Sequence, residues 1–171
     1  MSQVSFENRT VIVTGAGNGL GKAYALDLGS RGAKVVVNDL GGAVDGSGSG
    51  STPADEVVNE IIANGGEAVA NYDSVATKEG GESIVQTAID NFGTVDAVVN
   101  NAGILRDKSF ANMSEDELSL IIDVHLKGTF FVSQPAFKVM KENSYGRIVN
   151  VASPSGLFGN FGQSNYGAAK M

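Results

Sequence analysis

Tyr166 and Lys170 lie four residues apart in the stretch GNFGQSNYGAAKM, residues 159–171. In a helix this spacing places both side chains on one face. A phenol beside an ammonium can move a proton, because the positive charge favours the phenolate form. Taken alone, the pair fits a solvated helix surface as well as an acid/base device. The elements that position the pair therefore decide between these two interpretations.

Short runs rich in valine and isoleucine alternate with helical patterns along the chain. Strands are predicted at residues 10–14, 34–38, 67–71, 96–100 and 147–151. Most are apolar on successive residues, as expected of strands buried on both faces. Helices are predicted near residues 20–31, 53–64, 78–91 and 114–141. This alternation predicts an α/β fold with a doubly wound parallel sheet.

Two segments depart from the regular alternation. Residues 41–53, GGAVDGSGSGSTP, are rich in glycine and serine. We interpret them as a long surface loop, because the roughly 40 residues before them are too few to form a separate domain. Pro135 falls inside the fourth predicted helix and is expected to kink it, because proline lacks the N–H of one helical hydrogen bond. No functional role follows for Pro135.

Composition limits the kind of protein this is. The 171 residues are 42% hydrophobic and 18% charged, which fits a single domain over residues 1–171. The absence of cysteine excludes disulfides, and a single histidine, His125, excludes a multi-histidine metal centre. A net charge of −7 argues against nucleic-acid binding. No apolar run is long enough to span a membrane and no signal peptide is apparent, so we expect a soluble intracellular protein.

The stretch TGAGNGLG directly follows the first predicted strand and opens the first helix. Glycines at Gly15, Gly19 and Gly21 allow a tight turn and a close backbone approach to a pyrophosphate at the helix N-terminus. A merely tight turn between strand and helix is the alternative. The position at a strand-to-helix junction favours dinucleotide binding.

Asp39 ends the second strand, 18 residues after Gly21. An acid at this place hydrogen-bonds the adenosine ribose 2′-hydroxyl and repels a 2′-phosphate, so NAD is favoured over NADP. A strand-end aspartate that caps a turn is the alternative interpretation.

These residues, together with NNAG at residues 100–103, Ser153 and YGAAK at residues 166–170, resemble the short-chain dehydrogenase/reductase family along the whole chain. The resemblance implies a Rossmann-type sheet of order 3-2-1-4-5 in the part present. Within the family, VVVNDLGGAVDGSGSGS, VVNNAGILRDKSF and GRIVNVASPSGLFGNFGQSNYGAAK are most similar to (3R)-hydroxyacyl-CoA dehydrogenase units of peroxisomal multifunctional enzymes of type 2.

The resemblance implies roles for three residues. Tyr166 would be the acid/base at the substrate oxygen. Lys170 would hold the nicotinamide ribose and favour the Tyr166 phenolate. Ser153, which precedes Tyr166 by 13 residues, would hydrogen-bond the substrate oxygen. From the residues alone Ser153 could equally serve a polar turn, and only the spacing distinguishes it from Ser155.

The resemblance also implies a set of cofactor contacts. Asp73 would meet the adenine amine, and NNAG would line the cofactor cleft. The full set expected to contact NAD is Gly15, Asn18, Gly19, Leu20, Gly21, Asp39, Asp73, Ser74, Asn101, Ala102, Gly103, Tyr166 and Lys170.

His125, in DVHLKGTF, occupies a position where most family members have an asparagine that holds a water for proton relay. It is therefore a candidate fourth catalytic residue. A buried histidine bonded to a backbone carbonyl is the alternative.

The leading hypothesis is NAD-dependent oxidation of a 3-hydroxyacyl-CoA to its 3-keto form in fatty-acid β-oxidation, without a metal. An NAD-dependent hydroxysteroid dehydrogenase and a non-catalytic NAD-binding fragment are the alternatives. The partners expected are a small substrate, acyl-CoA or steroid, and a second copy bound through the fourth and fifth helices. In a eukaryote the location would be peroxisomal, and otherwise cytoplasmic.

The family continues well past the position of Lys170. We therefore expect the chain to be a truncated domain that lacks C-terminal strands and the substrate loop. Such a chain would associate through its fifth strand, bind NAD weakly and turn over poorly.

Overall fold

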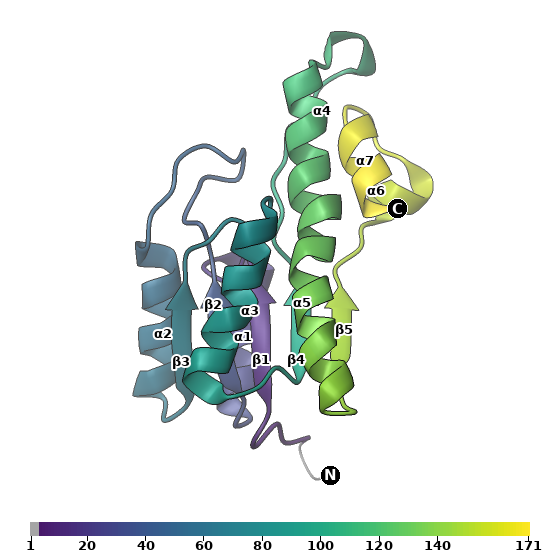
Figure 1. Cartoon of the computed structure of the whole chain (residues 1–171). Coiled ribbons are helices and arrows are strands. Elements are labelled where there is room, and N and C mark those ends of the chain that lie inside the picture. The colour runs from purple at the N-terminus through teal and green to yellow at the C-terminus, as the bar shows by residue number, and fades with distance from the viewer. Residues whose placement is uncertain (1–3) are drawn as a thin grey trace.

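The computed structural model describes residues 4–171, so the first three residues of the predicted domain lie outside the described part. One five-stranded parallel sheet has the order β3-β2-β1-β4-β5 (Figure 1). Its strands are β1 Thr10–Thr14, β2 Lys34–Asn38, β3 Glu67–Asn71, β4 Ala97–Asn100 and β5 Arg147–Asn150. The predicted strand order is confirmed, and β4 and β5 are each one residue shorter than predicted.

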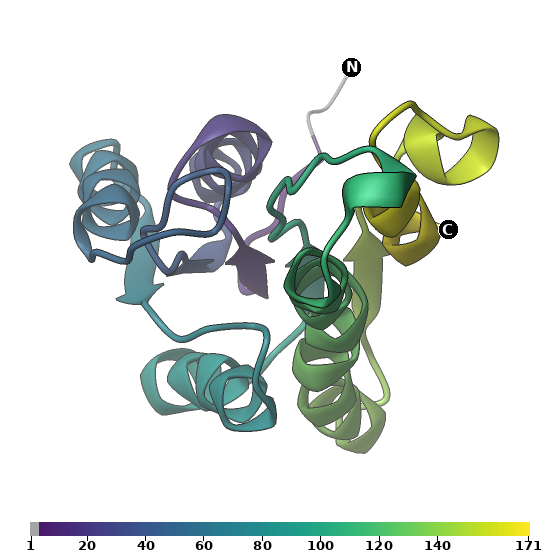
Figure 2. The ribbon, with the colours of Figure 1, turned by 90° about the horizontal axis from the view of Figure 1, so that it is seen from above.

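Helices cover both faces of the sheet (Figure 2). α1 Gly19–Ser30 and α2 Thr52–Ala63 lie on one face, and α3 Lys78–Phe92 and α5 Gly128–Glu142 lie on the other. The short elements η1 Phe110–Asn112, α4 Glu115–Ile122, α6 Pro154–Phe158 and α7 Ser164–Lys170 belong to connections beyond the strand carboxyl ends. In Figure 1 all arrowheads point to the edge near α4, α6 and α7. No helix within residues 4–171 has the length and apolarity to cross a bilayer.

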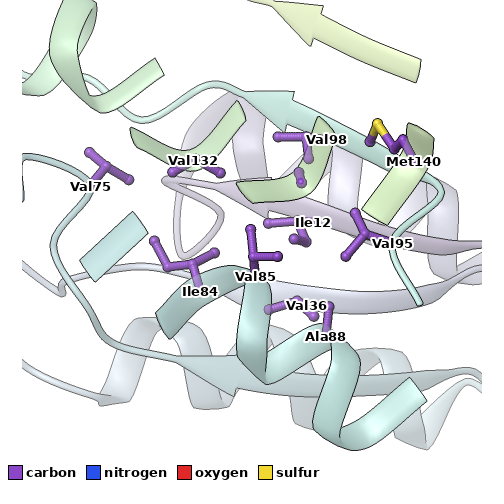
Figure 3. Close-up of a cluster of buried hydrophobic side chains, with 11 residues drawn as sticks. Ile12, Val36, Val75, Ile84, Val85, Ala88, Val95, Val98, Val132 and Met140 are labelled. Carbon is purple, nitrogen blue, oxygen red and sulfur yellow. The ribbon is translucent and has the colours of Figure 1, made fainter. Parts of the chain in front are cut away.

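Two apolar clusters hold the layers together because side chains of each strand alternate between the faces. Ile12 and Val36 point toward α3 and α5, where they pack with Val85, Val98 and other side chains (Figure 3). The neighbouring strand residues pack instead against α1 and α2, and this second cluster contains Val11, Val13, Val35, Val37, Val57 and Ile61. Burial on both faces explains why the strand sequences are apolar without alternation.

The fourth predicted helix is divided differently from the expectation. Ser114 caps α4 in a reciprocal capping box with Glu117, and α4 passes through a π-helical turn, Asp123–Lys127, into α5. α5 continues through Pro135. Pro135 therefore does not end the helix, and the π-helical departure from α-helical geometry contains His125. A proline removes only its own bond to the preceding turn, and buried Val132 and Ala136 hold the helix against the sheet on both sides of it.

The surface loop predicted at residues 41–53 lies between β2 and α2 but ends at residue 51, because α2 begins at Thr52. Residues 40–51 are named the cover loop here. The loop is not free of contacts. Leu105 N–H donates to the Val44 carbonyl at 2.9 Å, and Arg106 Nε donates to the Asp45 carbonyl. Both partners belong to the segment that follows β4, so the cover loop crosses the carboxyl edge of the sheet.

We expect Ile12→Ala to lower the free energy of unfolding by about 2–5 kcal/mol, because it opens a cavity among fully buried side chains. Chemical denaturation measures this change. Ile62→Ala, on the outer face of α2 where the side chain is 53% exposed, removes the same atoms and should cost less than about 0.5 kcal/mol. Equal losses from the two variants would contradict the assigned core.

Candidate functional site

A cleft of about 390 Å³ opens at the carboxyl edge of the sheet. It is bounded by the ends of β1, β2, β3 and β4, by the cover loop, and by apolar side chains of Ile104, Leu120 and Val124. The predicted cofactor residues that line it are Gly15, Asn18, Gly19, Asp39, Asp73, Ser74, Asn101, Ala102 and Gly103. Residues from four separate strand ends are thus brought into one cleft.

The remaining predicted cofactor residues lie outside its lining. Leu20 is exposed on the first turn of α1, and Gly21 is buried beneath the glycine loop. Tyr166 and Lys170 belong to α7 and do not line the cleft. The site consequently has two parts, a cleft and a neighbouring cluster on α7.

The glycine loop is fixed against the end of β4. Gly15 has a φ of +62°, and an added Cβ would lie 2.7 Å from the Ala102 Cα, so conformation and space both require glycine. Asn101 donates from its side-chain amide to the carbonyls of Thr14 and Gly15, both at 3.0 Å. The Asn101 side chain therefore supports the loop.

The N-terminus of α1 meets this cleft with its first N–H groups free of intrahelical partners, as in every helix. The residue at the N-cap, Asn18, makes no side-chain cap hydrogen bond. Gly19, the first residue of the helix, lines the cleft. An anionic group can bind there, since the helix dipole and the unpaired N–H groups both favour negative charge.

Thr14 is a site residue that the sequence interpretation missed. Its buried hydroxyl accepts hydrogen bonds from the backbone N–H groups of Asn101 at 3.1 Å and Ala102 at 3.0 Å. This oxygen joins the end of β1 to the segment after β4. A hydroxyl at the end of an otherwise valine-rich strand was the available signal.

Asp39 uses both carboxylate oxygens in the cleft wall. Oδ2 accepts from the Gly17 N–H at 2.7 Å and Oδ1 accepts from the Gly41 N–H at 2.7 Å. The second bond closes a turn, so the turn-capping alternative is realised together with the predicted position in the cleft. A carboxylate offers about four acceptor sites, which leaves capacity for ligand hydroxyls.

Asp73 is held in place at the end of β3. Its Oδ2 accepts from Ser83 Oγ at 2.7 Å and from Asn71 Nδ2 at 2.9 Å. Asn38 Nδ2 donates to the Asp73 carbonyl at 2.9 Å. The amides of two strand ends thereby fix the side of the cleft that lies away from α7.

His125 is buried in the π-helical turn behind the cleft. Its Nε2 lies 2.8 Å from the Ile104 carbonyl oxygen and 3.1 Å from the Ile104 nitrogen. An added Cβ on Gly103 would collide with the imidazole, so a side chain at this position would displace the ring. The contact with the Ile104 carbonyl agrees with the alternative interpretation of His125, a buried histidine bonded to a backbone carbonyl.

Burial is the main cause of the lowered pKa of His125. It lowers the pKa to about 4; the Ile104 hydrogen bond opposes the shift, and the positive charge of Lys170 adds to it. His125 is therefore neutral near pH 7. In one neutral tautomer Nε2–H donates to the Ile104 carbonyl, and the buried Nδ1 is an acceptor with no partner among residues 4–171. This tautomer is the less costly of the two, because the other would bury an N–H donor without a partner.

Tyr166 and Lys170 lie together on α7 as predicted. Lys170 Nζ is 5.9 Å from the Tyr166 ring centroid and donates to the Val151 carbonyl at 2.7 Å. The His125 ring meets the Tyr166 ring edge-on at 5.1 Å between centroids. Burial lowers the pKa of Lys170. Both side chains are half-buried, so the pair is not a fully solvated helix surface.

Ser153 lies on the same wall, two residues after Val151. It caps α6, and its Oγ accepts from the Ser155 N–H at 3.2 Å. The Ser155 hydroxyl points elsewhere and donates to Gln163 Oε1 at 2.9 Å. Ser153 thus serves the turn that opens α6, which is the alternative that the sequence left open for it.

The arrangement can bind a ligand with an anionic centre and hydroxyl groups in the cleft, and can exchange a proton at Tyr166 beside a cation. Among residues 4–171, no three acidic or histidine side chains gather as a metal ion would require.

Sequence relatives cover nearly the whole chain. It is 61% identical over 98% of its length to peroxisomal hydratase-dehydrogenase-epimerase of Saccharomyces cerevisiae, and 56% identical over 99% to peroxisomal multifunctional enzyme type 2 of Mus musculus. It is 58% identical over 96% to a short-chain type dehydrogenase/reductase of Mycobacterium tuberculosis. The chain spans only 18%, 23% and 58% of the lengths of these relatives, respectively.

A solved structure has the same fold. It is a 7α-hydroxysteroid dehydrogenase in complex with NADH and 7-oxo glycochenodeoxycholic acid, with a TM-score of 0.88 and 29% identity. The match covers 97% of this chain and 61% of that protein. The family model described as short chain dehydrogenase matches residues 9–171. The chain therefore belongs to the short chain dehydrogenase family.

Proposed function

We propose that this chain is the NAD-binding catalytic unit of a dehydrogenase that oxidises a 3-hydroxyacyl-CoA to the 3-ketoacyl-CoA. The observation that carries the proposal is that the cleft connects, through Ile104 and His125, to Tyr166 on α7. Ile104 lines the cleft and bonds His125, and the His125 ring packs against Tyr166. A dinucleotide in the cleft would therefore end beside a proton-transferring pair.

The residues present fit a nicotinamide dinucleotide. The glycine loop and the uncapped N-terminus of α1 suit a pyrophosphate, and Asp39 suits a ribose with free hydroxyls. Asp73 and Ser74 would lie at the adenine, and residues 101–103 would flank the rest of the ligand. When bound, NAD would supply the acceptor for the hydride that leaves the alcohol carbon.

In this mechanism the chain's own residues manage the proton. Tyr166 accepts the proton of the substrate hydroxyl as the carbonyl forms, and Lys170 stabilises the phenolate by its charge. Ser153 donates a hydrogen bond to the substrate oxygen and stabilises the developing negative charge. Lys170 is held for this purpose by the Val151 carbonyl, which fixes the ammonium between β5 and α7.

His125 enters the proposal as a residue that positions the wall between Ile104 and Tyr166. A neutral ring packed edge-on against Tyr166 limits where the phenol can lie. The Nδ1 of the neutral ring, which has no partner among the described residues, would be the acceptor toward the relay water that the family pattern implies. The ring is thus compatible with both roles considered for it.

The substrate class rests on the names of the peroxisomal relatives, of which the yeast protein is a hydratase-dehydrogenase-epimerase. The same names support a peroxisomal location if the source is a eukaryote. A hydroxysteroid is the second candidate, because the structural neighbour was solved with a bile-acid derivative. Parallel assays of NADH formation with a short 3-hydroxyacyl-CoA and with a hydroxysteroid test the two classes. Formation of NADH with neither would contradict the proposed activity.

The proposal includes a homodimer. Leu126, Phe130 and Phe137 are between 42% and 58% exposed along the π-helical turn and α5. Their spacing of four and seven residues places them along one helix face, as a helix-to-helix interface requires. Sedimentation of the purified chain measures the oligomeric state.

NAD is expected to bind at least about tenfold more tightly than NADP, because a carboxylate at Asp39 repels a 2′-phosphate and accepts from a 2′-hydroxyl. Asp39→Ala should weaken NAD by about tenfold and narrow the difference between the cofactors. Titration calorimetry with each cofactor measures the two dissociation constants. Asp90→Asn, an equal charge change at the distant end of α3, should leave both affinities unchanged. Equal affinities in the unmodified protein would refute the assignment.

Tyr166→Phe should lower kcat by at least about 100-fold while the Kd for NAD changes little, because only the phenol oxygen takes part in proton transfer. Tyr145→Phe is the matched control. It deletes the same atom from a ring packed against Arg9 and Arg147 at the opposite edge of the sheet, and should keep full activity. Retention of most of the activity by the Tyr166→Phe variant would remove Tyr166 from the mechanism.

The free energy of unfolding should fall as the pH drops from about 6.5 to about 4, in part because of His125. Its pKa is about 4 in the folded chain against an ordinary 6.5, so the unfolded chain takes up the proton first. The histidine contribution amounts to about 3 kcal/mol at most. Denaturation of the unmodified protein and of His125→Asn at several pH values isolates it, since acidic groups affect both alike. Parallel curves for the two proteins would disprove the effect.

A further inference from the structure

Asn165 immediately precedes Tyr166 and is only 1% exposed. Its Nδ2 donates to the Arg106 carbonyl at 3.1 Å and to the Glu117 carbonyl at 3.0 Å. Its Oδ1 accepts from the Tyr166 N–H at 2.8 Å. Both amide hydrogens and the amide oxygen of this side chain are thus in use, each with a different residue.

Two of these bonds join α7 to other parts of the molecule, and the third lies within α7. Glu117 belongs to α4, and Arg106 belongs to the segment that follows β4. A primary amide is suited to this place because it offers two donors and an acceptor in one plane. A carboxylate would oppose two carbonyl oxygens, and an apolar side chain would lose the bonds to both.

α7 depends on such bonds for its orientation. The helix is only seven residues long, too short to be stable by its own hydrogen bonds. The residue that precedes it, Gln163, makes no side-chain cap bond. The buried amide of Asn165 therefore supplies directional contacts at the first turn, directly before the residue that carries the phenol.

The Arg106 segment also reaches the cleft. Its neighbour Leu105 donates to Val44 of the cover loop, and Ile104 bonds His125. Asn165 thereby connects the helix that carries Tyr166 to the same short segment that contacts both the cover loop and the cleft wall. One connection between Tyr166 and the cleft therefore runs through this amide, beside the contact of the Tyr166 ring with His125.

We propose that Asn165 is a positioning residue that sets Tyr166 and Lys170 relative to the cofactor cleft. It acts through α7 and need not touch substrate or cofactor. The inference rests on the proposed function for its kinetic consequences, whereas its structural consequence can be measured without turnover.

The test compares Asn165→Ala and Asn165→Asp with the unmodified chain. Asn112→Ala is the matched control, because this exposed asparagine also donates from Nδ2, to Ser109 Oγ, but lies outside the site. Hydrogen exchange should become at least about tenfold faster at amides 166–171 in Asn165→Ala and stay unchanged in β1. kcat should fall by about 10- to 100-fold, while the Kd for NAD changes less than about threefold because most proposed contacts lie elsewhere.

Asn165→Asp tests the hydrogen bonds of residue 165 through the pH dependence of activity, which a role in packing alone would not change. Its carboxylate faces two carbonyl oxygens, and protonation restores one donor. The activity of this variant relative to the unmodified chain should therefore rise as the pH falls, whereas the relative activity of Asn165→Ala should not.

Three outcomes decide the proposal. Exchange at amides 166–171 that matches the control, or that accelerates equally in β1, would overturn it. A kcat within about twofold of the unmodified chain in both variants would also overturn it. If the unmodified chain oxidises none of the alcohols, the proposed function fails, and selective exchange at amides 166–171 still supports the positioning role.

Discussion

The site depends on one constraint of parallel sheets. Where the strands end at the carboxyl edge, the backbone leaves the hydrogen-bond ladder, and its polar groups need other partners. Here β1 ends in Thr14, and the other strands end in Asn38, Asn71, Asn100 and Asn150. These side chains bond each other and the loops: Asn38 donates to Asn71 Oδ1 at 2.9 Å, and Asn100 donates to Asn150 Oδ1 at 2.8 Å. The edge that would otherwise be poorly paired becomes a row of hydrogen-bonded polar side chains, and the loops of the cleft start from it.

The sheet was predictable because its sequence signals are local. Strands buried on both faces must be apolar throughout, and glycines and caps mark where each helix begins or ends. The interruption of the long helix was not predictable in the same way. The π-helical turn at Asp123–Lys127 is tied to contacts of His125 with Ile104, and the Thr129 hydroxyl bonds the His125 carbonyl at 2.8 Å. The first of these partners is distant in sequence, so local propensity gave no signal for the π-helical turn.

The residues of the candidate site likewise differ in whether local sequence signals predict their positions. The glycine loop, Asp39 and the residues after β4 have fixed positions relative to strand ends, so the sequence located them in the cleft. Thr14 and Asn165 were missed because a threonine or asparagine has no local pattern that reveals which distant carbonyl or N–H it will bond. The cover loop illustrates the same limit. Its composition indicated a surface loop, but not its bonds to Leu105 and Arg106.

Electrostatics explains how His125, Tyr166 and Lys170 can share one wall. Burial opposes charge on both His125 and Lys170, and lowers the pKa of each. The two differ in what compensates them. Lys170 Nζ has a carbonyl acceptor at 2.7 Å and remains partly exposed, whereas His125 is 6% exposed and can satisfy Ile104 while neutral. Only one cation therefore stands beside Tyr166 near neutral pH. A charged His125 would add repulsion toward Lys170 without contributing a bond that its neutral form lacks, so the buried ring shapes the wall and leaves the charge to the lysine.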